Sequence, residues 1–346
     1  MSAAISPLRS KLSNATDLVM RPATWWMQRN DMRALGIART RRIARAYNRM
    51  KFRPIHRLRQ ALYREHFDQL LAENNDGVAP ANGIRMQDGL YLDESKSLPH
   101  LDRMLDDAEQ IIRANGGKKF EDFGKPYFQS ILPSGALSTY PSLLDFATSS
   151  ALLKPVCDYM GCVPVLSTGE PRGVRFMEST TKFDPDADGP PRESQLWHID
   201  YHDAPMVYVI VALRDISIEC GPLHYLPAST STDAARTLRY WSRGVPYRLT
   251  DEMFYNVVDR DLVRRFTVPR GMVLFLDSTA CFHYGSRNAV QPRYHLPLTH
   301  ASPCRTTCSM RIAAKSKPAT PSATGIVRGL NGSSSWPGKT TICVAS

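Results

Sequence analysis

The sequence predicts an α+β protein in which helices come first and β-strands follow. Helical patterns lie before about residue 170, and short strand patterns separated by Gly, Pro and Asp turns run from about residue 172 to residue 300. With 346 residues, of which 42% are hydrophobic, the chain can bury one large core or two modest ones. Successive short strands favour a sandwich, a jelly roll or a barrel, with the helices packed outside it.

Residues 1–80 are predicted to form a basic helical N-terminal extension. Residues 1–60 contain 14 Lys or Arg and two acidic residues, whereas residues 61–277 contain 22 basic and 31 acidic ones. Apolar residues recur at helical spacing between residues 33 and 74, and Pro54 predicts a break between two helices. The first of these helices has an Arg-rich face, which comprises Arg39, Arg41, Arg42, Arg45 and Arg49.

Two interpretations of this extension stay open. An Arg-rich face with Trp25 and Trp26 nearby fits an anionic membrane surface, contacted through residues 1–60. The same face also fits a solvated helix that docks on the core. We do not expect nucleic acid as a partner.

The sequence has no run of 18 uncharged apolar residues, and its first 15 residues lack a continuous apolar segment with a cleavage site. Seven cysteines at scattered spacing predict reduced thiols rather than a disulfide framework or a zinc ribbon. We therefore expect a cytoplasmic protein that is either free or peripheral at a membrane surface.

Residues 81–300 are predicted to form the main domain. A strand is expected at 83–94, an amphipathic helix at 100–117 that ends at a glycine pair, and a second helical stretch at 141–161. The later strands are expected at 172–180, 195–200, 205–215, 222–227, 264–269, 271–277 and 294–299. Residues 301–346 are rich in Ser, Thr, Pro and Gly, which predicts a low-complexity, disordered tail.

The stretch QLWHIDYHDAP, residues 195–205, holds two histidines and two aspartates close together. In a strand, His198 and Asp200 lie on the same face. In a helix, His198 and His202 share a face instead, as in helical zinc motifs. Trp197 and the β-branched run after Pro205 favour the strand, and the glutamate of the helical motif is replaced by isoleucine.

The strand interpretation divides the polar residues of this stretch. His198 and Asp200 converge on one point, whereas His202 and Asp203 fall in the turn that follows and shape the mouth of the pocket. One histidine and one carboxylate are two-thirds of a facial triad, a ligand set that leaves positions open on iron(II).

A third ligand has to come from a distant strand, and His283 is the candidate. It follows the buried-looking strand at 272–276, and Arg293 follows ten residues later at the start of another strand. Arg293 could hold a carboxylate in a bidentate contact, with Arg287 as an alternative. Ordinary structural roles are expected for His56, His66, His100, His224, His295 and His300.

These motifs, taken in order, resemble the phytanoyl-CoA dioxygenase family of iron(II)- and 2-oxoglutarate-dependent oxygenases. They are W-H-x-D, then G-P-L-x-x-L-P-x-S at Gly221–Ser229, then R-G-x-V-L-F-x-D with a later His and Arg. The resemblance covers about residues 83–300. It implies a double-stranded β-helix (jelly roll, cupin-like) core with flanking helices. It also implies that His198, Asp200 and His283 hold iron(II) and that Arg293 binds the distal carboxylate of 2-oxoglutarate.

The activity implied by this resemblance is hydroxylation of an unactivated C–H bond in a small organic or lipid-like substrate. Molecular oxygen would be consumed, and succinate and CO₂ would be released. Related halogenases lack the acidic ligand, so the presence of Asp200 favours hydroxylation. We expect a pocket lined by Tyr208 and Tyr225, joined by Phe176 or, in the opposite strand register, by Arg175.

Two other functions stay open. The barrel could have lost catalysis and act as a binding module through its Arg-rich N-terminus. Alternatively, the protein could be a zinc hydrolase that uses His198 and His202.

Overall fold

The structure is a computed structural model that describes residues 37–73, 83–120, 125–166, 173–201, 203–242 and 244–302. Some predictions lie outside these residues: those for residues 1–36 with Trp25 and Trp26, for the side chains of Arg41 and Arg45, for His202 and for the tail from residue 303.

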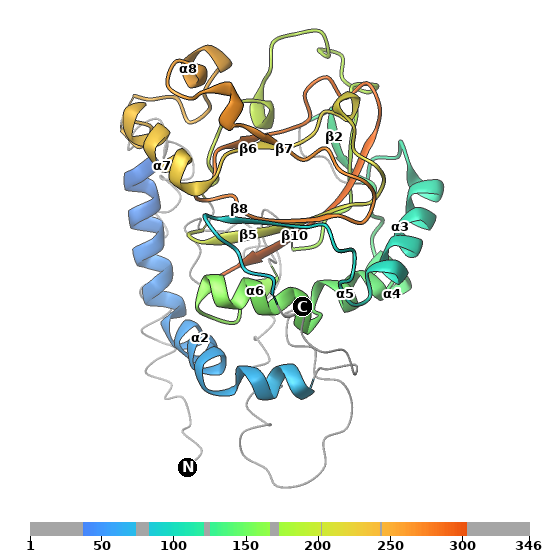
Figure 1. The fold of residues 1–346 in the computed structure, drawn as a ribbon, viewed down its shortest axis with the longest axis vertical. Helices are drawn as coiled ribbons and strands as arrows, with labels where there is room; N and C mark the ends of the chain where they lie inside the picture. Colours follow the sequence, from blue (N-terminus) through green and yellow to red (C-terminus); the bar gives the residue numbers. More distant parts are fainter. Residues whose placement is uncertain are drawn as a thin grey trace, which may run out of the picture.

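Helices and short strands alternate along the described part of the chain (Figure 1). The helices are α2 (Ile37–Glu73), α3 (Leu101–Asn115), α4 (Ala136–Thr139), α5 (Ser142–Ala147), α6 (Ser150–Met160), α7 (Ala228–Thr237) and α8 (Asp251–Tyr255). The 3-10 turns are η2 (Glu193–Gln195), η3 (Ile218–Cys220) and η4 (Arg260–Leu262). The strands are β1 (Leu90–Asp93), β2 (Phe128–Ser130), β3 (Val165–Leu166), β4 (Met177–Ser179), β5 (Met206–Ala212), β6 (His224–Tyr225), β7 (Arg264–Arg265), β8 (Val273–Asp277), β9 (His283–Tyr284) and β10 (Arg293–Ala301).

The strands form two antiparallel sheets. The large sheet has seven strands in the order β1-β8-β5-β10-β4-β2, with β3 paired to the end of β10. The small sheet has three strands in the order β7-β6-β9. In Figure 1 the small sheet lies opposite one face of the large sheet, and α3, α5 and α6 lie against the other face. Antiparallel sheets flanked by helices fit a jelly roll, so the predicted α+β class is confirmed.

The long strand β10 shows how one sequence serves both faces of the large sheet. Tyr294, Leu296 and Leu298 pack into the hydrophobic core on the helix side. The residues that alternate with them, Arg293, His295 and Pro297, line a cavity on the other side of the sheet. Side chains alternate along a strand, so a single strand contributes to the core and to the cavity at once.

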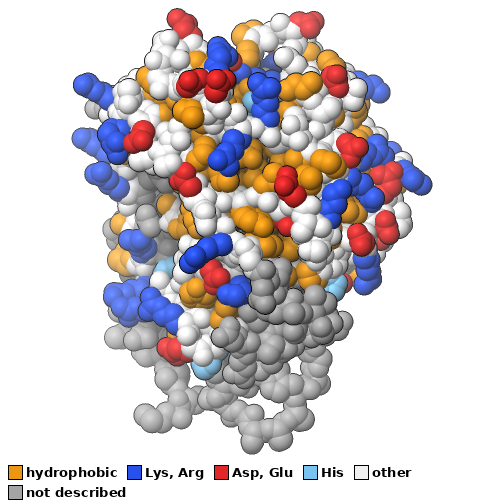
Figure 2. All heavy atoms as spheres, in the orientation of Figure 1, with side chains coloured by type: hydrophobic (Ala, Val, Ile, Leu, Met, Phe, Trp, Pro, Cys, Tyr) orange, Lys and Arg blue, Asp and Glu red, His pale blue; other side chains and the backbone are white. Residues whose placement is uncertain are grey.

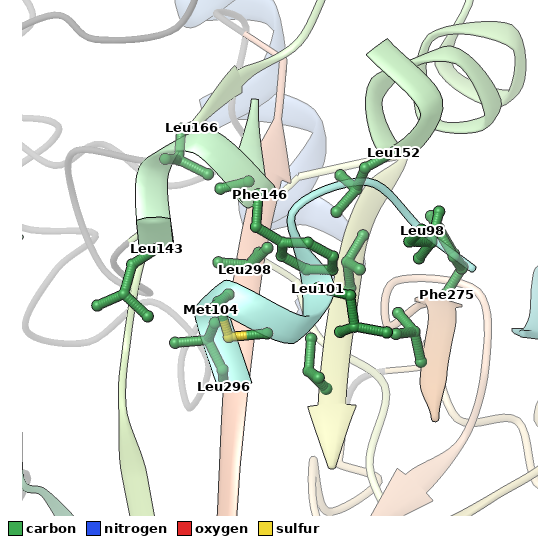
Figure 3. Close-up of a cluster of buried hydrophobic side chains, with 14 of the residues drawn as sticks. Leu98, Leu101, Met104, Leu143, Phe146, Leu152, Leu166, Phe275, Leu296 and Leu298 are labelled. Atoms are coloured by element: carbon green, nitrogen blue, oxygen red, sulfur yellow. The ribbon is translucent and has the colours of Figure 1, made fainter. Parts of the chain in front are cut away.

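The core on the helix side is formed by side chains from α3, α5, α6 and the large sheet. Figure 3 shows Leu101, Met104 and Phe146 from the helices meeting Leu296 and Leu298 of β10. Phe146 and Met104 are fully buried. Each such side chain stabilises the fold by about 1.5–3 kcal/mol relative to leaving it exposed.

Helix α3 matches its prediction closely. Its buried residues recur at helical spacing, at Leu101, Met104, Leu105, Ala108, Ile111 and Ile112. The helix ends at the predicted glycine pair, where the amide of Gly116 donates to the carbonyl of Ile112 at 2.8 Å. The apolar stripe of α3 is therefore what attaches it to the sheet.

Two helix predictions need correction. Pro54 does not separate two helices, because α2 runs from Ile37 to Glu73 with Pro54 inside it and changes direction along its length (Figure 1). A proline removes one backbone bond and can kink a helix without ending it. The stretch 141–161 is not one helix either, since Thr148 and Ser149 separate α5 from α6 and Ser149 has an extended backbone.

Most strand predictions were right in place but too long, whereas β10 extends beyond the predicted 294–299 and residues 195–200 form single bridges instead of a strand. Within residues 83–94, only Leu90–Asp93 pairs with β8. Asp88 and Gly89 have positive φ angles of 50° and 79°, which turn the chain just before the strand. Propensity cannot reveal such a turn when apolar residues flank it.

The C-terminal half of α2 packs on the rest of the protein, as one of the two interpretations requires. Phe67 belongs to the main core, and Arg59 donates from Nη2 to the carbonyl of Pro164 at 2.9 Å. Among the helices that the structure describes, none has the length and apolar character needed to cross a bilayer. Figure 2 shows hydrophobic side chains gathered across the middle of one face, with acidic and basic side chains around them.

Candidate functional site

The segment that carries His198 is extended, as predicted, but it pairs in single bridges rather than as a full strand. Trp197 bridges to Leu249, and His198 bridges to His283 of β9. Two backbone hydrogen bonds join the histidines, from the His198 amide at 3.1 Å and from the His283 amide at 2.9 Å. The pairing therefore places two distant histidines side by side through their backbones.

Trp197 anchors this segment from the opposite face. It is fully buried, and its ring stacks on Phe254 of α8 with centroids 3.9 Å apart. The ring of Tyr284 meets it edge-on at 4.6 Å. Since neighbouring residues of an extended chain point to opposite faces, burying Trp197 directs His198 into the cavity.

His198, Asp200 and His283 form a cluster that could hold a metal ion. One ligand atom from each lies within 4.8 Å of the others, and all three residues are buried. The Nε2 atoms of both histidines lie 3.9 Å from the Asp200 carboxylate, one from each of its oxygens. The structure thus brings together the three residues that the sequence selected.

Hydrogen bonds orient both imidazole rings. Nδ1 of His198 lies 2.7 Å from the carbonyl of Leu196, and Nδ1 of His283 lies 2.9 Å from the carbonyl of Cys281. A carbonyl only accepts, so each Nδ1 donates a hydrogen bond to its carbonyl and each Nε2 is the ring nitrogen that faces Asp200. Burial, and secondarily the neighbouring His283, lowers the pKa of His198 to about 3. Two imidazole Nε2 atoms beside a carboxylate fit a divalent transition metal.

Asp200 is held by its backbone to the end of the large sheet. Its amide donates to the carbonyl of Ser278 at 2.8 Å, just after β8. The Tyr208 ring on β5 faces the same carboxylate. Burial and then the charge of Asp200 raise the pKa of Tyr208, whereas Arg175 opposes this shift, so the phenol keeps its proton.

Arg293 lies in the same cavity as the predicted metal ligands. Its guanidinium donates to the Gly221 carbonyl and to the hydroxyls of Ser179 and Ser286, at 3.1 and 3.0 Å for the two serines. Its Nε atom is buried without a hydrogen-bond partner, and burial lowers the Arg293 pKa to about 10. No carboxylate among the described residues forms an ion pair with Arg293, so an anionic ligand would compensate this buried charge.

Gly221 explains why the G-P-L motif belongs to this site. Its φ of 59° is left-handed, and a Cβ there would lie 2.5 Å from the carbonyl oxygen of Arg287. Only glycine fits this turn, and its carbonyl then meets Arg293. The motif therefore shapes the position of the arginine.

The cavity has a volume of about 360 Å³ and lies between the two sheets. Aromatic side chains line it, including Phe128, Tyr201, Tyr208 and Tyr247, together with four cationic side chains, Lys125, Arg175, Arg248 and Arg293. Its size is at the small end of the usual range for ligand pockets.

No family model matches this chain, and no curated protein matches it. Several solved structures resemble it. AviO1 from Streptomyces viridochromogenes Tue57 has a TM-score of 0.38 and 15% identity, covering 63% of this chain and 92% of that one. The epimerase SnoN in complex with Fe³⁺, alpha ketoglutarate (2-oxoglutarate) and nogalamycin RO has a TM-score of 0.39 and 14% identity, covering 73% and 91%. EctD from S. alaskensis with 2-oxoglutarate and 5-hydroxyectoine has a TM-score of 0.39 and 13% identity, covering 62% and 72%. These likenesses are distant, and the function of this chain is argued below from its own residues.

The predicted pocket lining was right in part. Tyr208 lines the cavity, but Tyr225 does not: it packs in a hydrophobic cluster with Phe266 and Leu276, of which Leu276 also reaches the cavity. The sequence left open whether Phe176 or Arg175 faces the cavity. In the structure Arg175 lines the cavity and Phe176 lies in the core.

Two further residues have roles other than the predicted ones. Asp203 does not form the pocket mouth, because it is buried and accepts hydrogen bonds from the amide and hydroxyl of Ser302 at 2.6 and 3.0 Å. Arg287 is not a free alternative to Arg293, since its Nη1 forms an ion pair with both carboxylate oxygens of Asp251, at 2.9 and 2.8 Å.

Among the cavity residues that sequence reasoning missed, Lys125, Arg248 and His295 carry titratable groups. His295 was assigned an ordinary role, yet it lies two residues after Arg293 on the same strand face. The period-2 rule applied to Arg293 would have found it. Burial, and secondarily the charge of Arg293, lowers the pKa of His295, so this imidazole is neutral. Lys125 and Arg248 lie outside strands and helices, where no pattern indicates the direction of a side chain.

Proposed function

We propose that this protein is an iron(II)- and 2-oxoglutarate-dependent oxygenase of the phytanoyl-CoA dioxygenase family that hydroxylates a small organic or lipid-like substrate. One observation supports this more than any other. Two buried histidines present their Nε2 atoms to one carboxylate, in a cavity that also holds a buried arginine without a carboxylate partner. Two histidines and one carboxylate with open positions are typical of iron(II) oxygenases.

When bound, iron(II) and 2-oxoglutarate supply the oxidising power: with dioxygen, 2-oxoglutarate becomes succinate and CO₂, and one oxygen atom enters a C–H bond of the substrate. The chain holds the components in place. His198, Asp200 and His283 bind the metal, and Arg293 binds the distal carboxylate of 2-oxoglutarate. The rings of Tyr208 and Tyr247 line the cavity beside these residues.

The test is an anaerobic titration of the metal-free protein with iron(II) and 2-oxoglutarate, monitored by the weak visible charge-transfer band of the iron chelate. We expect the band to reach its full intensity at one iron(II) ion per protein molecule. His283→Ala should lack it, whereas His66→Ala on α2, far from the cavity, should retain it. Wild type without a band, or a band of full intensity in His283→Ala, would refute the proposal.

Arg293→Lys separates metal binding from co-substrate binding. The variant keeps the charge but loses the planar guanidinium, so 2-oxoglutarate should bind at least tenfold more weakly while iron(II) affinity is retained. The zinc hydrolase alternative predicts instead that metal binding depends on His202. We expect His202→Ala to bind iron(II) as wild type does. If wild type instead binds one zinc ion per molecule and His202→Ala does not, that result would favour the hydrolase.

An exposed basic stripe on α2 supports a second role, contact with an anionic membrane surface. Six exposed arginines recur at spacings of 3, 4 or 7 residues and so share one helix face: Arg39, Arg42, Arg49, Arg53, Arg57 and Arg64. Vesicles containing phosphatidylserine should bind the protein in a salt-sensitive manner, whereas phosphatidylcholine vesicles should not. Replacing the six arginines with glutamine should abolish this binding, and unchanged binding would exclude the stripe.

A further inference from the structure

The cavity carries more positive charge than the proposed metal and co-substrate require. Lys125, Arg175 and Arg248 line it in addition to Arg293, and Asp200 is the one carboxylate among its described lining residues. The cations come from three separate segments, before β2, before β4 and before α8. Their gathering at one cavity is therefore a product of the fold rather than of a basic run in the sequence.

Among the described residues, no ion pair neutralises Lys125 or Arg175, although the charges of Glu193 and Asp200 act on Lys125. The guanidinium of Arg175 lies over the Tyr208 ring at 5.4 Å, and its Nε is buried without a hydrogen-bond partner. Arg248 differs, because it forms an ion pair with Glu193. Two cations at the cavity thus have no ion-pair partner in the part of the chain that the structure describes.

The proposed co-substrate does not supply that counter-charge. A divalent metal, the Asp200 carboxylate, the Arg293 guanidinium and the two carboxylates of 2-oxoglutarate sum to zero net charge. Lys125 and Arg175 remain. Leaving two cations partly desolvated without an anion is costly, so a ligand that brings negative charge is favoured.

Much of the remaining lining is apolar or aromatic, and Ser194, Ser286 and His295 add polar groups to it. Phe128, Tyr201 and Tyr247 line the cavity together with Leu223, Leu276 and Pro297. Such walls suit an apolar or aromatic molecular body and give few partners for a sugar or another polyol.

We propose that the substrate is a small organic anion, with an apolar or aromatic body and one carboxylate or phosphate group that Lys125 and Arg175 bind. This inference rests on the proposed function, whose substrate class it names. The anionic group lies away from Arg293, so that co-substrate and substrate occupy separate cationic sites. A single carboxylate and a phosphate share this chemistry, and the probes below distinguish them.

The test uses three probes of similar size: benzoate, phenyl phosphate and the neutral benzyl alcohol. Their binding to the full-length protein is measured by calorimetry, with anaerobic iron(II) and saturating 2-oxoglutarate, and again without either. We expect both anions to bind at least tenfold more tightly than benzyl alcohol in each condition. Phenyl phosphate tighter than benzoate would assign the site to phosphate esters, and the reverse order would assign it to carboxylic acids. Equal binding of all three probes would overturn the proposal.

The variants Lys125→Met and Arg175→Met remove one cation each. A hydrogen bond to a charged group contributes about 1.5–3 kcal/mol, so each variant should weaken anion binding by about 10- to 100-fold and leave benzyl alcohol unaffected. Lys182→Met, an exposed lysine outside the cavity, is the matched control for the first variant. Arg260→Met is the control for the second, since Arg260 also lies over a tyrosine ring, that of Tyr255, at 3.9 Å. Both controls should bind the anions as wild type does.

Conservative variants guard against misfolding. Lys125→Arg and Arg175→Lys keep the charge, so they should retain most of the anion affinity. Loss of 2-oxoglutarate affinity in Lys125→Met and Arg175→Met with unchanged benzoate binding would overturn the proposal, because the cations would then serve the co-substrate. The two proposals can fail separately. Absence of the charge-transfer band would refute the oxygenase proposal. Binding of benzoate to the metal-free protein that depends on Lys125 and Arg175 would still support the anion site.

Discussion

At the scale of single residues, Tyr208 connects the metal-binding cluster with the rest of the cavity. It lies on β5 opposite Leu276 of β8, and its phenol faces both Asp200 and Arg175. Because its pKa is raised, the hydroxyl remains a donor at neutral pH and can orient the carboxylate. Groups that orient a ligand affect metal affinity although they never touch the metal.

We therefore expect Tyr208→Phe to weaken iron(II) binding by about 10- to 100-fold, the usual cost of losing a partner that orients a ligand. The measurement is the dissociation constant for iron(II) under anaerobic conditions. Tyr225→Phe is the matched control, since Tyr225 is buried outside the cavity. Equal affinities for Tyr208→Phe and wild type would show that Asp200 needs no support from Tyr208.

Residue-scale prediction from the sequence worked where chemistry and strand period acted together. His198 and Asp200 were placed on one face by the alternation of a strand, and His283 and Arg293 by their order after a buried strand. Asp203 was misplaced because nothing in the sequence announces its contact with Ser302, 99 residues away. Hydrogen bonds over such separations follow from the tertiary fold alone.

At the scale of elements, Arg287 ties α8 to the loops beside the site. It forms an ion pair with Asp251, the first residue of α8, and its guanidinium lies 3.6 Å from the centre of the Tyr284 ring. It also donates from Nε to the carbonyl of Gln195, three residues before His198. The side chain of Arg287 is largely buried, whereas Asp251 is half exposed.

Arg287→Met should lower the free energy of unfolding by about 1–3 kcal/mol, less than for a fully buried ion pair because water screens Asp251. Chemical denaturation measures this change. Arg236→Met breaks the exposed Arg236–Asp233 pair and should change stability by less than about 0.5 kcal/mol. Similar losses in the two variants would mean that Arg287 does not hold α8.

Predictions at the element scale were accurate for long periodic patterns and weaker for short ones. The buried stripe of α3 identified that helix almost to the residue. By contrast, β6, β7 and β9 are two residues long, which is too short for a period-2 pattern to set their bounds. Pro54 misled for a related reason, since the turns of α2 on either side keep the helix continuous across the missing bond.

At the scale of the whole molecule, buried neutral histidines make stability depend on pH. Burial lowers the pKa of His300 and of His224 to about 4, from an ordinary value of 6.5. Below pH 6.5 these two histidines become protonated in the unfolded chain, whereas they stay neutral in the folded chain until the pH approaches 4. The stability from these groups is therefore complete above pH 6.5 and is lost as the pH falls toward 4.

We expect the free energy of unfolding to fall steadily between pH 6.5 and pH 4, by up to about 1.4 kcal/mol per pH unit for each such histidine. Denaturation is measured with a chelator present, so that bound metal adds no pH dependence. His300→Gln should reduce the slope of unfolding free energy against pH by up to about 1.4 kcal/mol per pH unit, the value for one proton. An unchanged slope in that variant would mean that His300 does not titrate on unfolding.

The pairing of His198 with His283 also affects how the protein can be studied. These residues are 85 positions apart, so bringing them together closes a long loop, and the entropy of that closure is recovered only when both sheets are in place. A partly folded chain therefore cannot assemble the ligand set. Under the proposed function, metal uptake would occur only in native molecules, so it would measure how much of a preparation, or of a destabilised variant, has reached the native state.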